Sequence, residues 1–97
     1  MIFKLSKEAE NDLENIWLYT FENWSAEQAD RYLNLIIDEI EYLSQKPESG
    51  INFENFRKGY FRSKVKSHFI FYRINAQKEA LEIIRILHER MDIDNHL

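Results

Sequence analysis

YFRSKVKSHFIFYRINAQKEALEIIRILH, residues 60–88, is the stretch that decides the fold. It contains three short runs rich in β-branched and aromatic residues, at 61–66, 69–74 and 81–88. Consecutive runs of this kind, separated by short gaps, predict successive antiparallel strands. The middle run is apolar nearly throughout, which is typical of a central strand covered on both faces. We therefore expect a three-stranded meander as the scaffold of the chain.

A short strand at 2–5 and two amphipathic helices are expected before the meander. Ser6 is well placed to cap the first helix, and Ser25-Ala26-Glu27-Gln28 matches the capping box of a second. Pro47 ends the second helix, because it lacks the N–H that the helical ladder needs. The expected core stripes are Ala9, Leu13, Ile16, Trp17, Thr20 and Trp24 in the first helix, and Ala29, Leu33, Ile36, Ile37, Ile40 and Leu43 in the second. Two such helices joined by a short link predict a hairpin packed on the sheet.

The segment 48–59, between the helices and the meander, has no clear periodicity. A loop of about a dozen residues is long for a compact domain, and such loops are often functional or fixed by their own aromatic side chains. We expect Phe53 and Phe56 to pin this loop against the edge of the core.

Length and composition predict a single domain, residues 1–97, with one core. The absence of cysteine excludes a disulfide framework and a thiolate metal site. Three histidines without i, i+4 spacing do not favour a metal site either, and we expect no cofactor. No signal peptide or membrane-spanning run is recognisable, so the expected location is the cytoplasm. A net charge of -4 argues against a protein whose whole surface binds nucleic acid, but it does not exclude a local basic face.

One cluster of cationic and proton-transferring side chains could carry chemistry. The two-residue period places Arg62, Lys64 and Lys66 on one face of the first meander strand. With side chains from the next strands, they could stabilise a phosphorane and move a 2′-hydroxyl proton, as in a metal-free ribonuclease. The cluster on these strands also includes Arg73, and the residues that a ribonuclease would use are Lys64, Lys66, Tyr72, Arg85 and His88. The alternative, which the acidic composition favours, is a solvated face whose long cations cover apolar surface.

Arg85 is an exception inside an aliphatic strand. Such an arginine is typical of a position near the sheet edge or paired with a carboxylate. Four apolar or aromatic side chains lie outside the core stripes of the helices, and we interpret them as partner contacts rather than a small-molecule pocket. These are Leu18, Tyr19, Leu35 and Tyr42.

Several runs carry a resemblance to a known family. They are Leu5–Trp17, Trp24–Ala29, Tyr32-Leu33, Phe69–Arg73 and Ile84–Asp92, with His96-Leu97 at the end. Together they resemble the ParE branch of the RelE/ParE toxins of bacterial toxin–antitoxin modules. The resemblance extends over essentially the whole chain, and the run from Ile86 to Asp92 is its most specific part. It implies an α+β fold, β-α-α-β-β-β, with a helical hairpin packed on a small antiparallel sheet.

The resemblance also implies a function. A ParE toxin is expected to act on DNA gyrase without being an enzyme, and to be neutralised by a ParD-type antitoxin, through which alone it reaches operator DNA. RelE-type relatives instead cut mRNA on the ribosome with a basic cluster. The acidic net charge and the ParE-like ending depart from the RelE pattern. A ribosome-dependent mRNA endonuclease and an inactive toxin relative stay open as alternatives.

Site residues follow from the resemblance by region only. It assigns gyrase contact to the end of the last strand and to a short C-terminal tail, residues 89–97. The residues concerned are Arg85, His88, Arg90 and Met91. A segment of the antitoxin that folds on binding needs an apolar groove. We expect it at Leu18, Tyr19, Leu35 and Tyr42, together with the exposed edge of the sheet.

Overall fold

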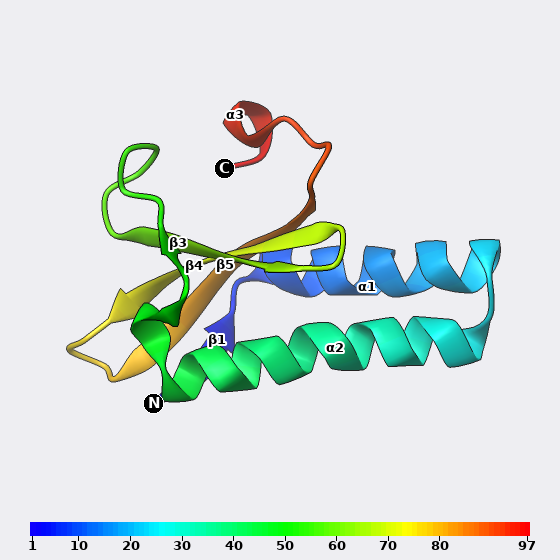
Figure 1. Cartoon of the computed structure of the whole chain (residues 1–97), viewed down its shortest axis with the longest axis horizontal. Helices are drawn as coiled ribbons and strands as arrows, with labels where there is room; N and C mark the ends of the chain where they lie inside the picture. The colour runs from blue at the N-terminus through cyan, green and yellow to red at the C-terminus, as the bar shows by residue number, and fades with distance from the viewer.

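The computed structural model describes all 97 residues and shows two packed layers (Figure 1). Helices α1 (Lys7–Asn23) and α2 (Ala26–Gln45) form a hairpin on one side of a five-stranded sheet. The strands are β1 (Ile2–Leu5), β2 (Ile51–Asn52), β3 (Tyr60–Val65), β4 (His68–Asn75) and β5 (Ala80–His88). Short helical turns η1 (Pro47–Ser49) and α3 (Ile93–His96) follow α2 and β5. The predicted meander is confirmed as β3–β4–β5, and so is the helical hairpin.

The strand order is β1-β5-β4-β3-β2. All neighbours pair antiparallel except β1, which runs parallel to β5 with Phe3 opposite Leu81. The α+β fold is therefore confirmed, but the sheet is mixed and not purely antiparallel as expected. Two helices separate β1 from the meander, so no tight turn dictates its direction, whereas tight turns do so within the meander.

The helix ends follow their predicted caps. Ser6 Oγ accepts a hydrogen bond from Ala9 N at 3.0 Å, and Ser25 Oγ accepts one from Gln28 N at 3.1 Å. The α2 helix stops at Gln45, shortly before Pro47. None of the helices combines the length and the apolar character needed to cross a lipid bilayer.

The core lies between the helices and the sheet. Its buried side chains come from α1, α2, β4 and β5: Ala9, Leu13, Ile16, Ile36, Ile40, Leu43, Ile70, Tyr72, Leu81, Ile83 and Ile86. Trp24 was expected in this core, and that expectation is wrong, because its side chain is 62% exposed. The hairpin extends past the sheet, so the turn between α1 and α2 has no strand beneath it (Figure 1). Trp24 begins this turn.

The second face of the sheet is partly covered by the β2–β3 loop and the C-terminal tail (Figure 1). In the loop, the ring of Phe53 stacks on Phe56 with centroids 5.4 Å apart and lies 5.7 Å from Phe71 of β4. Phe71 is fully buried. The loop is thus pinned by its aromatic side chains, as the sequence predicted.

Candidate functional site

A groove of about 700 Å³ lies where α1, the first half of α2 and the ends of β4 and β5 meet. Its walls combine aromatic and aliphatic side chains with a few polar ones: Asp12, Asn15, Ile16, Tyr19, Thr20, Trp24, Gln28, Tyr32, Ser67, His68, Ile86, His88 and Met91. Tyr19 and Trp24 are each more than half exposed, and their rings contact edge to face at 6.2 Å. Exposed aromatic side chains beside a groove are typical of a surface that binds another protein.

The floor of the groove holds a tyrosine and two histidines. Tyr32 Oη lies 2.6 Å from His68 Nδ1, and it also accepts a hydrogen bond from Ser67 N at 3.3 Å. His68 pairs directly with His88 across β4 and β5, with the rings nearly perpendicular and 5.2 Å apart. While Ser67 N donates to its oxygen, the Tyr32 phenol can donate its own hydrogen to His68 Nδ1, an arrangement in which neutral His68 carries its ring proton on Nε2.

Burial, with a smaller contribution from neighbouring His88, lowers the pKa of His68 from 6.5 to about 4. Asp12 and Glu89 act in the opposite direction but do not offset the burial. Burial also raises the pKa of Tyr32. Both side chains are therefore neutral at pH 7 and are suited to hydrogen bonding. A general base works best with a pKa near the operating pH, which His68 does not have.

A β-bulge shapes the end of β5. Phe71 of β4 pairs with Arg85 and Tyr72 pairs with Ile83, so Ile84 is an extra residue. The bulge lets both Ile83 and Ile86 face the core, while Arg85 points away from it. Arg85 then reaches Asp12 of α1 through two hydrogen bonds, Nε to Oδ2 at 2.8 Å and Nη2 to Oδ1 at 2.9 Å. The expectation that Arg85 pairs with a carboxylate is confirmed.

Asp12 and Arg85 connect α1 to the strand and to the tail. Asp12 Oδ2 also accepts from Ile86 N at 2.9 Å, and Arg85 Nη1 donates to the carbonyl oxygen of His96 in α3 at 2.8 Å. The Asp12 carboxylate raises the pKa of Arg85. The guanidinium is thus occupied on three sides, and its side chain is only 21% exposed.

Of the residues that the resemblance assigned to gyrase contact, His88 and Met91 line the groove. Arg90 is exposed, and its backbone N–H donates to His88 Nδ1 at 3.1 Å. Arg85 lies behind them in the network with Asp12 and His96. The structure therefore brings His88, Arg90 and Met91 to one exposed corner. Arg85 instead has partners within the chain.

The ribonuclease candidates lie in separate environments. Tyr72 is fully buried, and its hydroxyl donates to Pro47 O at 2.8 Å and accepts from Gly50 N at 3.1 Å. Burial raises the pKa of Tyr72. Lys64 pairs with Glu89 at 2.9 Å on the far side of the sheet from Tyr72. The predicted cationic cluster is thus not assembled into one site.

Arg73 has a carboxylate partner, whereas Arg62 contacts aromatic rings and its buried Nε has no hydrogen-bond partner. Arg73 pairs with Glu82 at 2.6 Å, which raises the pKa of the arginine and lowers that of the glutamate. The guanidinium of Arg62 lies between the rings of Phe53 and Phe69, at 4.7 and 4.6 Å from their centroids. This arrangement matches the alternative in which long cations cover apolar surface.

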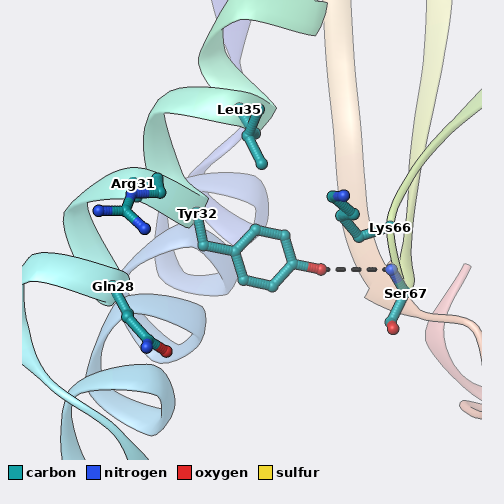
Figure 2. A pocket seen from close by; sticks show the side chains of 6 residues that line it. All are labelled: Gln28, Arg31, Tyr32, Leu35, Lys66 and Ser67. Carbon is teal, nitrogen blue, oxygen red and sulfur yellow. Dashed lines mark hydrogen bonds between the residues drawn. The ribbon is translucent and has the colours of Figure 1, made fainter.

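Lys66 does not share a strand face with Arg62 and Lys64, so that expectation is wrong. The β3 strand ends at Val65, and Lys66 has a φ of 53° in the turn before β4. The two-residue period therefore stops one residue before Lys66. Its side chain instead borders a hollow of about 280 Å³ beside α2, opposite Leu35 (Figure 2).

The four side chains predicted to bind the antitoxin are all exposed, but they do not form one patch. Tyr19 lines the groove, and Leu35 borders the hollow of Figure 2, which shares Tyr32 and Ser67 with the groove. Leu18 borders a different hollow of about 440 Å³ between the two helices. Tyr42 lines neither the groove nor these two hollows.

Sequence patterns did not identify Asp12, Tyr32 and His68 as site residues. Asp12 falls on the polar side of the α1 pattern, where a carboxylate is usually solvated. Tyr32 sits at the margin of the α2 stripe, and His68 has no partner at helical or metal-ligand spacing. The one available signal was Arg85, whose place in an aliphatic strand predicted either a position near the sheet edge or a carboxylate partner.

Comparisons of the sequence with known proteins give matches over nearly its whole length. The family described as "ParE toxin of type II toxin-antitoxin system, parDE" matches residues 3–93. Toxin ParE1 of Caulobacter vibrioides is 39% identical over 95 residues, which cover 98% of this chain and 96% of the relative. Toxin ParE1 of Mycobacterium tuberculosis is 34% identical over 95 residues, with the same coverage of both chains.

Solved structures share the fold. A chain of the "Chromosomal ParDE TA system from P. aeruginosa" superposes with a TM-score of 0.78 at 19% identity, covering 91% of this chain and 95% of that one. A chain of the toxin–antitoxin complex RelBE2 from Mycobacterium tuberculosis has a TM-score of 0.69, also at 19% identity, over 90% and 95% of the two chains. The family match and the sequence identities over nearly the full length show that this chain belongs to the ParE toxins of type II toxin–antitoxin systems.

Proposed function

We propose that the chain inhibits DNA gyrase, without being an enzyme, and that a ParD-type antitoxin neutralises it in the cytoplasm. The observation that carries the proposal is the ParE match across residues 3–93, which includes all of β5 and the start of the tail. Operator DNA is contacted only through the antitoxin, and the chain needs no cofactor.

The proposal assigns gyrase contact to the exposed corner formed by His88, Arg90 and Met91. Met91 is 45% exposed and Arg90 is exposed, so both can enter an interface without unfolding the end of the strand. Arginine and methionine are both enriched at protein–protein interfaces. No observation favours the ribonuclease alternative, since its proposed residues do not share a site.

The antitoxin is assigned to the groove and the adjoining hollow of Figure 2. The groove and this hollow together run along the first half of α2, from Tyr19 and Trp24 to Leu35. An amphipathic helix of the partner could lay its apolar side chains into such a groove. Tyr19 and Leu35 are retained as contacts from the predicted set, while Leu18 and Tyr42 belong to other parts of the surface.

Gyrase supercoiling assays test the proposed target. Purified toxin should inhibit supercoiling and increase the amount of gyrase-cleaved plasmid, and a chain with His88, Arg90 and Met91 changed to alanine should inhibit less. Lys46→Ala is a matched control, because Lys46 is an exposed cation that follows α2, remote from the tail. The proposal would be refuted if the wild-type chain at micromolar concentration neither inhibited supercoiling nor increased the amount of cleaved plasmid. Primer extension on translated mRNA, showing codon-aligned cuts, would favour the endonuclease instead.

A further inference from the structure

Three segments that are distant in the sequence meet at the Arg85 guanidinium. Asp12 comes from α1, Arg85 from the end of β5, and His96 from α3. Asp12 and Arg85 are 73 residues apart in the chain, and their side chains are 11% and 21% exposed. The contact therefore links the first helix to the last turn of the chain.

The orientation of this guanidinium is fixed from the Asp12 side. Its Nε and Nη2 both donate to the carboxylate, and such a two-pronged contact sets the plane of the arginine fork. The carboxylate itself is held by Ile86 N, so it cannot rotate freely. One nitrogen, Nη1, remains, and it donates to the His96 carbonyl oxygen at 2.8 Å.

The end of the tail, residues 92–97, has few polar contacts with the rest of the chain, whereas residues 89–91 are also held by hydrogen bonds from Glu89 N to Ser67 O and from Met91 N to His88 O. Its α3 helix is only four residues long, and helices of that length are not stable on their own. Asp92 caps this turn from within the tail, accepting from Asp94 N at 3.1 Å. The bond from Arg85 is the only hydrogen bond that joins residues 92–97 to the rest of the chain. The polar attachment of residues 92–97 thus depends on a guanidinium that Asp12 orients.

We propose that Asp12 is a positioning residue for the corner that contacts the target: it orients Arg85, and Arg85 holds α3 so that Arg90 and Met91 are presented in one arrangement. This inference rests on the proposed inhibition of gyrase. It also revises the role of Arg85, which acts through the tail and does not touch gyrase. Asp12, which lies outside the exposed corner, then contributes to inhibition.

A double-mutant cycle on gyrase inhibition tests the inference. The four chains are wild type, Asp12→Asn, a deletion of residues 92–97, and the two changes combined. Asp12→Asn and the deletion should each raise the inhibitory concentration about tenfold, the effect expected for loss of one charge-assisted hydrogen bond. The combined chain should be no weaker than the deletion alone, because Asp12 acts only through the tail. The inference would be overturned if the fold-increase for the combined chain equalled the product of the two single increases. It would also be overturned if Asp12→Asn or the deletion left the inhibitory concentration unchanged.

Arg85→Lys separates positioning from a purely structural role. A lysine keeps the charge and can pair with Asp12, but it has no second arm for the His96 carbonyl. Positioning predicts that Arg85→Lys inhibits gyrase as weakly as the deletion, although the lysine can still pair with Asp12 and circular dichroism shows the chain to be folded. Inhibition at the wild-type level by Arg85→Lys would refute the role of the tail contact.

Hydrogen exchange reports on the tail without gyrase. In Asp12→Asn and Arg85→Lys, the amide of Leu97, which donates to Ile93 O in the wild type, should exchange faster. Amides in α2 provide the control and should not change. If the wild-type chain does not inhibit gyrase, the proposed function fails and this inference fails with it. Wild-type inhibition with a tail amide that is unaffected by Asp12→Asn would overturn the inference alone.

Discussion

Replacement of His68 should remove part of the acid sensitivity of the fold. The folded pKa of His68 is about 4, below the 6.5 of an exposed histidine. As the pH falls below 6.5, His68 becomes protonated in the unfolded chain but stays neutral in the folded chain. The stabilisation is therefore complete above pH 6.5 and is lost progressively as the pH falls toward 4.

The magnitude follows from the two pKa values. At about pH 5, a shift from 6.5 to about 4 corresponds to a loss of about 2 kcal/mol in the free energy of unfolding, relative to neutral pH. The ring is only half-buried at the floor of the groove, so solvent screening reduces this figure to about 1 kcal/mol. His68→Gln removes the titrating group at similar polarity.

Urea unfolding, followed by the fluorescence of the two tryptophans, measures the effect at about pH 7.5 and about pH 5. Wild type should lose about 1 kcal/mol more than His68→Gln between these conditions. His96→Gln is the control, since its side chain is exposed in α3, and it should behave as wild type. Glu82 and Glu89, whose pKa values are lowered by their basic partners, titrate in all three chains. Equal losses in wild type and His68→Gln would refute the reasoning.

Three further changes address packing and the groove. Gly50→Ala should lower the free energy of unfolding by about 2 kcal/mol, because its Cβ would overlap Tyr72 Oη and lie 2.9 Å from Arg62 O; chemical denaturation would show this. Tyr72→Phe should cost about 1–2 kcal/mol in the same assay, since Pro47 O and Gly50 N lose a buried partner. Trp24→Ser should change stability by less than about 0.5 kcal/mol, but it should weaken antitoxin binding in calorimetric titration.

Local patterns predicted most of the fold because the forces that they report act over a few residues. The Ser6 and Ser25 caps and the stop before Pro47 each depend on neighbours within one helical turn. The exposure of Trp24 depends instead on where the sheet ends beneath α1, which no periodicity in α1 can report. The parallel direction of β1 likewise depends on how the hairpin returns the chain to the sheet.

The site was less predictable, because its parts come from separate elements. A carboxylate partner was one of two predictions for Arg85. A chain with 17 acidic residues offers many carboxylates, and only the packing of α1 selects Asp12. The bulge at Ile84 breaks the strict alternation on which strand-face predictions rest. His68 and Tyr32 meet across 36 residues, and neither has a sequence signature for that contact.

The start of α1 also protects the sheet against unwanted assembly. Beyond Leu5, the strand β1 no longer covers β5, which leaves backbone groups of a long strand facing outward. Ser6 and Asp12 occupy them: Ser6 donates to Ile83 O and Ile84 O, and Asp12 accepts from Ile86 N. A strand edge with occupied hydrogen-bonding groups cannot template another chain. Loss of these side-chain contacts would therefore expose an aggregation-prone edge in addition to weakening the fold.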